Sequence, residues 1–142
     1  MGSRRKGRII AFKAIFSWDF NNNDISDLIE FTLADESNKK TTKEDSIIFA
    51  KLIIKGTIDN IAEIDEKIKQ HISNWDFKRI AKVDLAILRL STYSLLFQKD
   101  IAGNIIIDEA IDISKEFSSE ESYRFINGVL DSIYKEITNE KI

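Results

Sequence analysis

The amino-acid sequence predicts an all-α fold, and three observations support that prediction. The chain of 142 residues has no proline and only five glycines, so few residues would interrupt a helix. Apolar residues recur every three to four positions over long segments, which is the period of an amphipathic helix. The Ser/Thr-x-x-Glu pattern of a helix-capping box occurs at Thr41 and at Ser118.

The expected helices follow one another with short connections. The first extends over about residues 5–20, and the second over about residues 25–33. A long amphipathic stretch begins at the capping box of Thr41 and runs to Ile68, and Gly56 could divide it. The remaining helices cover about residues 79–97, 105–117 and 118–137, for a total of about six or seven. We expect one domain of two packed helical bundles, with sub-bundles at about residues 4–72 and 76–138.

Gly128 would lie inside the last of these helices. The dipeptide Asn127-Gly128 is typical of a hairpin, but its apolar neighbours repeat at helical spacing. A glycine in a helix interior costs about 1 kcal/mol relative to alanine. Such a glycine suggests that another backbone or a ligand approaches the helix closely.

The composition excludes most kinds of catalytic site. The chain has no cysteine and a single histidine, His71, which removes disulfides, thiol nucleophiles and histidine-rich metal sites. His71 is expected on the surface at a helix end. The sequence has no glycine-rich phosphate loop, and the acidic pairs Asp108-Glu109 and Glu120-Glu121 suit helix N-termini without any catalytic role. We expect no enzyme, no cofactor and no metal.

The hydropathy pattern predicts a cytoplasmic protein without a membrane segment. No apolar run approaches the roughly 18–20 residues that cross a bilayer. The most apolar stretch, from Leu85 to Phe97, contains Arg89.

Charge is distributed unevenly along the chain. Up to Trp18 there are five basic residues and no acidic one, whereas the remainder holds 16 basic and 24 acidic residues. Cations at a helix start are unfavourable, because the dipole is positive there. An external anion would compensate, and guanidinium groups bind phosphate bidentately. Arginine-rich segments favour RNA over duplex DNA, although a solvated basic tail is an alternative. The five residues are Arg4, Arg5, Lys6, Arg8 and Lys13.

Three other side chains are candidates for partner contacts. Phe16 lies one helical turn after Phe12, and it could be exposed for a partner or form part of a second buried face. Asp84 and Arg89 lie in the most apolar segment, where unpaired charge is costly. They are either satisfied inside the fold or directed into an interface.

Several stretches resemble the NusB family of transcription antitermination factors. The opening residues 4–8 and 14–19, the central residues 84–93, and the closing residues 108–117 and 125–131 carry the resemblance, which covers about residues 4–134. This sequence departs from the family at Ser94, where glutamate is usual, at Asp108, where asparagine is common, and at Ser118, where glycine is frequent.

The resemblance implies a two-bundle helical fold and a function without catalysis. It implies binding of boxA RNA in ribosomal RNA transcripts together with ribosomal protein NusE, in an RNA polymerase antitermination complex, as a monomer or a homodimer. The five N-terminal cations would face RNA phosphates, and Glu121 and Phe125 would lie near the RNA. Phe16 and Asp84 would face NusE.

Two alternatives remain at this point. One is a NusB-like RNA-binding module related to that of ribosomal RNA methyltransferases, which we would expect to precede a long cofactor domain. The other is a helical protein-interaction module whose basic head is only a solvated tail.

Overall fold

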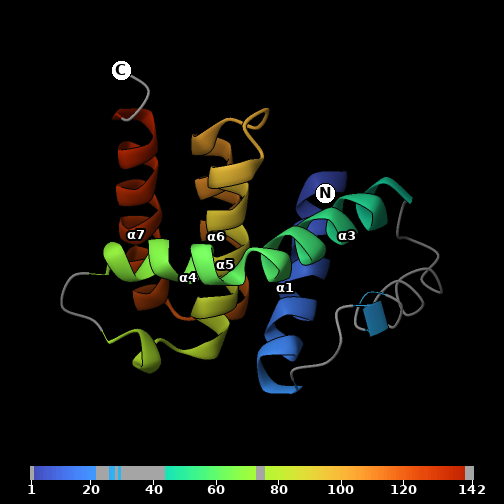
Figure 1. Ribbon diagram of the computed structural model, residues 1–142, viewed down its shortest axis with the longest axis horizontal. Coiled ribbons are helices and arrows are strands. Elements are labelled where there is room, and N and C mark those ends of the chain that lie inside the picture. Colours follow the sequence, from blue (N-terminus) through green and yellow to red (C-terminus); the bar gives the residue numbers. More distant parts are fainter. Residues whose placement is uncertain (1, 22–25, 28, 30–43, 73–75, 140–142) are drawn as a thin grey trace. The chain divides into compact units, whose positions relative to one another are not determined.

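The computed structural model of the protein describes residues 2–21, 26–27, 29, 44–72 and 76–139 (Figure 1). Within these ranges the chain forms six α-helices and one 3-10 turn, with no strand. The all-α prediction is confirmed. Most of the predicted second helix, and the capping box at Thr41, lie outside the described residues. No helix in the described ranges has the length and apolar character needed to span a membrane.

The chain divides into two compact units, residues 1–59 and 60–142. This boundary precedes the one near residue 72 that we expected. The reason is that α4 (Ile61–Gln70) packs against α5 (Lys82–Phe97) and α7 (Glu120–Asn139), and so belongs to the second unit. The break before α4 falls at Asn60 and not at Gly56, which lies inside α3 (Glu44–Asp59).

The first unit is built on the packing of α1 (Ser3–Asn21) against α3. Both helices bury a stripe at helical spacing, and small side chains alternate with isoleucine in it. The small residues let the helices approach closely, while the isoleucines fill the space between them. The buried residues are Ile10, Ala11, Ala14 and Ile15 of α1 and Ala50, Ile53 and Ile54 of α3.

Gly7 is a point of close approach between α1 and α3. A Cβ atom placed there would lie 2.9 Å from the Ser46 carbonyl oxygen and 2.9 Å from Cδ2 of Phe49. The glycine in the arginine-rich segment is therefore required by the packing of α1 on α3.

We predict that Gly7→Ala destabilises the protein by about 1–3 kcal/mol, the usual cost of overpacking a core. The backbone of Ser46 cannot move aside without shifting α3. Urea denaturation followed by circular dichroism measures the change. Gly2→Ala is the matched control, since a Cβ at Gly2 meets nothing within 4 Å and should leave stability unchanged.

In the second unit, α5 is the central helix, as its sequence predicted. It packs against α4, α6 (Gly103–Phe117) and α7, and every residue from Asp84 to Leu95 is buried. The helix begins later than expected. Residues Phe77–Arg79 form a 3-10 turn, in which the Asp76 carboxylate accepts a hydrogen bond from the Lys78 amide at 3.1 Å.

Two polar contacts attach α4 to this core. Arg89 of α5 donates from Nε and Nη2 to the two carboxylate oxygens of Asp65, each at 2.9 Å. The buried charge of Arg89 is thus satisfied inside the fold, which settles one of the alternatives above. The second contact, which we call the latch, joins α4 to α7 through His71.

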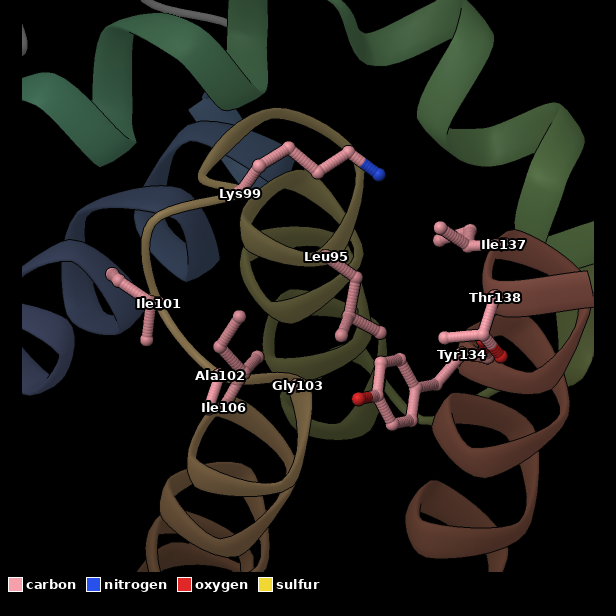
Figure 2. Close-up of a pocket in the computed structure, with 9 residues that line it drawn as sticks. All are labelled: Leu95, Lys99, Ile101, Ala102, Gly103, Ile106, Tyr134, Ile137 and Thr138. Carbon is pink, nitrogen blue, oxygen red and sulfur yellow. The ribbon is translucent and has the colours of Figure 1, made fainter. Parts of the chain in front are cut away.

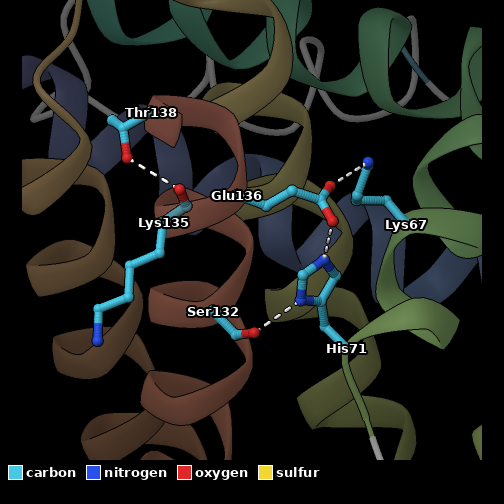
Figure 3. A network of polar contacts seen from close by, with 6 residues as sticks. All are labelled: Lys67, His71, Ser132, Lys135, Glu136 and Thr138. Carbon is cyan, nitrogen blue, oxygen red and sulfur yellow. Dashed lines mark hydrogen bonds and ion pairs between the residues drawn. The ribbon is translucent and has the colours of Figure 1, made fainter. Parts of the chain in front are cut away.

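The latch consists of four residues, Lys67, His71, Ser132 and Glu136 (Figure 3). The His71 ring nitrogens lie 2.7 Å from Ser132 Oγ and 3.0 Å from the Glu136 carboxylate, and Lys67 Nζ lies 2.5 Å from the other oxygen of that carboxylate. His71 does stand at a helix end, but its side chain is largely buried, so the expectation of a surface residue is wrong. Ser132, His71 and Glu136 have the residue types of a hydrolase triad. Here the Glu136 carboxylate is also paired with Lys67, and these four side chains serve to join α4 to α7.

The hydrogen bond from the Lys67 ammonium group is the main reason why the pKa of Glu136 lies below its ordinary value. A carboxyl group whose pKa is lower in the folded state stabilises the protein above its unfolded-state pKa of about 4.3, and loses that effect as the pH falls through the folded-state value.

We therefore predict that Glu136→Gln destabilises the protein at neutral pH, and that the difference from the original protein shrinks as the pH falls below about 4. Urea denaturation at a series of pH values measures this. Glu63→Gln, at an exposed position of α4, is the control. A constant difference across the series would contradict the assignment.

A surface pocket of about 160 Å³ lies where α5 ends, α6 begins and α7 ends (Figure 2). The Tyr134 ring enters it, directed toward Gly103 and Ile106. A side chain at Gly103 would overlap this ring, so the glycine makes room for Tyr134.

Candidate nucleic-acid interface

The cationic end of α1 is formed as predicted, but its five cations differ in accessibility. Arg4 and Lys13 are exposed, and Arg5 and Lys6 are half-buried. Lys6 and Lys13 are seven residues apart, so they share one face of the helix. No acidic residue occurs in the first turn of α1, so the positive end of the helix dipole adds to the side-chain charge.

Arg8 is the exception. Its side chain is 1% exposed, and its guanidinium lies 5.4 Å from the centre of the Phe49 ring of α3. A cation over an aromatic face is a stabilising contact within the fold. The packing of α1 on α3 covers Arg8, and its contact with RNA phosphate stays a prediction.

Three phenylalanines form a continuous row along α1. The Phe16 ring lies 6.3 Å from Phe12 and 4.9 Å from Phe20, measured between ring centres. Phe12 is buried, Phe16 is half-buried and Phe20 is 59% exposed. Phe16 is thus partly accessible, and it supports a more exposed ring. Sequence reasoning missed Phe20, although its spacing of four from Phe16 was a visible signal.

In the second unit, the predicted RNA-contacting residues line a surface pocket of about 250 Å³. The pocket lies between the start of α5 and the start of α7. Glu121 is exposed and Phe125 is half-buried, and a cation, Arg79, lines the same pocket. A pocket with an aromatic ring, a cation and carboxylate acceptors has the groups that hold a nucleotide. The pocket residues are Arg79, Ile80, Ala81, Asp84, Ser119, Glu121, Ser122 and Phe125.

Asp84 lines this pocket but is used by the fold. It is 7% exposed, and its two carboxylate oxygens accept hydrogen bonds from Ser118 Oγ at 2.8 Å and Ser122 Oγ at 2.9 Å. The contact of Asp84 with a protein partner stays a prediction. Its carboxylate joins the first turn of α5 to the connection between α6 and α7, and so positions Glu121 and Phe125.

The start of α7 also differs in detail from its prediction. Ser119, and not Ser118, caps the helix, since its hydroxyl accepts a hydrogen bond from the Ser122 amide at 3.2 Å. Ser118 is thereby free to bond Asp84, which gives this departure from the family a structural use. At another departure from the family, Ser94 donates to the side chain of Gln98 at 2.6 Å inside the core.

Sequence reasoning also missed a cluster of cations around Tyr123. The Lys115 ammonium lies 5.0 Å from the centre of the Tyr123 ring, and the Arg124 guanidinium lies 5.9 Å from it. Both cations are exposed, and Tyr123 immediately follows the pocket residues Glu121 and Ser122. Basic and aromatic side chains in one place are typical of surfaces that bind single-stranded nucleic acid.

The sequence profile of the NusB family matches residues 5–135. The chain belongs to the NusB family. It is 46% identical over 130 residues to the transcription antitermination protein NusB of Treponema denticola, an alignment that covers 92% of this chain and 94% of that protein. It is 41% identical over 138 residues to the NusB of Clostridium botulinum strain Kyoto, covering 90% of this chain and 96% of that protein.

Solved NusB structures share the fold. The NusB of T. maritima has a TM-score of 0.83 at 38% identity, and the match covers 94% of this chain and 91% of that one. A NusB chain in a crystal structure of antitermination factors NusB and NusE with double-stranded RNA has a TM-score of 0.85 at 29% identity. That match covers 96% of this chain and 98% of the other.

We predict that Asp84→Asn lowers the free energy of unfolding by about 1–3 kcal/mol, because a charged acceptor of two buried hydrogen bonds is lost. Urea denaturation measures the loss. Glu120→Gln, which removes a charge at an exposed position of α7, is the matched control and should be close to neutral. Equal stabilities of the two variants would mean that Asp84 does not hold the α6–α7 connection.

Proposed function

We propose that this protein is a transcription antitermination factor that binds the boxA element of ribosomal RNA transcripts together with NusE, in the cytoplasm and without catalysis of its own. The structural match to a NusB chain solved with NusE and RNA, over nearly the whole of both chains, carries the proposal. The 46% identity to the transcription antitermination protein NusB of Treponema denticola also supports it.

The residues that we propose for RNA binding come from both units. Phosphate groups would be met by Arg4, Arg5, Lys6 and Lys13, all of which keep some exposed surface. Phe125 offers a ring on which a base can stack, and the Glu121 carboxylate can accept hydrogen bonds from base amino groups. Arg8 is left out, because its guanidinium lies under the packing of α1 on α3.

NusE would contact the aromatic row of α1. Phe20, supported by Phe16, supplies an exposed apolar surface, and exposed rings are common anchors of protein interfaces. Asp84 contributes indirectly, through the position of the α6–α7 connection.

The deciding experiment is a titration of labelled boxA-like RNA with the protein, with and without NusE. Binding that strengthens when NusE is present is the expected result. A helical protein-interaction module would bind a partner and ignore RNA. If the protein binds RNA and NusE does not change that binding, the alternative of a module related to ribosomal RNA methyltransferases is favoured.

We predict that Lys13→Ala weakens RNA binding and reduces the slope of log K against log salt concentration by about 0.7–0.9, the value for one phosphate contact. The matched control is Lys51→Ala, which removes an exposed lysine from α3 of the same unit. Both variants lose one positive charge, so a purely long-range effect would act on both. Equal slopes for the two variants would mean that Lys13 does not contact an RNA phosphate.

We also predict that Phe20→Ala weakens NusE binding by about tenfold or more, as for an aromatic anchor, and leaves RNA binding of the protein alone unchanged. Isothermal titration with purified NusE measures it. Leu52→Ala, at another exposed apolar position of the first unit, is the control. An equal loss of NusE affinity in the two variants would mean that any exposed apolar side chain of this unit contributes, and that Phe20 is not a specific anchor.

A further inference from the structure

Gly128 has no function in the fold that the structure describes. It is exposed in α7, and a Cβ atom added there would meet nothing within 4 Å. It therefore differs from Gly7 and Gly103, where a side chain would collide with a neighbouring helix. A glycine inside a helix lowers helix stability relative to alanine. If the missing side chain has a role, that role is to let a binding partner approach the surface of α7.

The position of Gly128 connects it with the pocket at Phe125. Residues spaced by three or four along a helix lie above one another on one face. Glu121, Phe125, Gly128 and Ser132 have this spacing, so they form one stripe along α7. Its first two members line the pocket, and its last one belongs to the latch with His71 (Figure 3). A chain that occupies the pocket and continues along α7 would reach Gly128 next.

The surroundings of Gly128 suit a polyanion. Arg124 is exposed one turn before it, beside the Tyr123 ring and Lys115. Asp131, the acidic residue three positions after Gly128, is paired with Lys135 at 3.0 Å, which balances its charge. Cations, an aromatic ring and a surface without a side chain match a sugar–phosphate backbone better than an apolar protein surface.

We propose that the RNA strand leaving the pocket at Phe125 passes over Gly128, where the missing side chain lets its sugar–phosphate backbone lie directly against α7. The proposal rests on the proposed RNA-binding function and extends its footprint by about one turn of α7, from Phe125 to Gly128. The contact is to the backbone, so it contributes affinity and carries no base specificity.

The test is a pair of substitutions, Gly128→Ala and Gly128→Gln, with RNA affinity and thermal stability measured on the same samples. Both residues are good helix formers, so the midpoint of thermal unfolding should rise by a few degrees. The dissociation constant for a boxA-like single-stranded RNA should increase for alanine and increase by about tenfold for glutamine. A scrambled RNA of the same length should lose affinity by the same factor. A more stable protein that binds RNA less well cannot be explained by misfolding.

Two matched variants locate the effect. Asn127→Gln enlarges the neighbouring exposed side chain, which points about 100° around the helix from position 128, and should bind RNA as the original protein does. Phe125→Ala should weaken binding, because it removes the ring from the pocket itself.

Each contrary outcome has its own meaning. If the original protein binds RNA and Gly128→Gln binds it equally well, the footprint ends at the pocket and the inference fails alone. If Asn127→Gln loses as much affinity as Gly128→Gln, the strand does not pass over Gly128. If RNA binding is unchanged but NusE binding weakens, the surface belongs to the protein partner, which also overturns the inference. If the original protein binds no RNA, the proposed function fails with it.

Discussion

The second unit depends on the burial of α5 between three other helices. Because this helix is covered on nearly all sides, each polar group that it carries must be satisfied by a neighbour. Arg89 is satisfied by Asp65 of α4, and Asp84 by the two serines that flank the start of α7. The same requirement that stabilises the core thereby fixes where α4 lies and where the pocket at Phe125 opens. The pocket that we propose for RNA binding and the core of this unit therefore share the same polar contacts.

The helices could be predicted from the sequence because their apolar period is strong and proline is absent. The apolar composition of α5 predicted that other helices cover it. The charge pattern predicted the exposed cations Arg4 and Lys13. What the sequence could not show was the neighbour of each side chain. Arg8 looks like a surface charge in the linear pattern, and the position of Asp84 in an apolar segment leaves open whether it is satisfied inside the fold or by a partner. Only the packing of α1 on α3, and of α5 on α7, decides that both are buried.

Predictions about single residues, such as a helix cap or a helix end, were wrong for a related reason. Ser118 and Ser119 both suit a helix cap, and the choice between them depends on Asp84, 34 residues before Ser118. The break between α3 and α4 falls at Asn60 and not at the more obvious Gly56, because the second unit begins where α4 meets α5. Local propensity predicts that an element exists, whereas tertiary contacts decide where it ends.

The latch between α4 and α7 has a practical consequence. His71 is the only histidine in the chain, and its ring contacts α7 through both nitrogens. Its imidazole signals in a nuclear magnetic resonance spectrum will therefore be free of overlap from other histidines. They report directly on whether α4 is docked, so a single resonance can follow the opening of this edge of the bundle without any label being introduced.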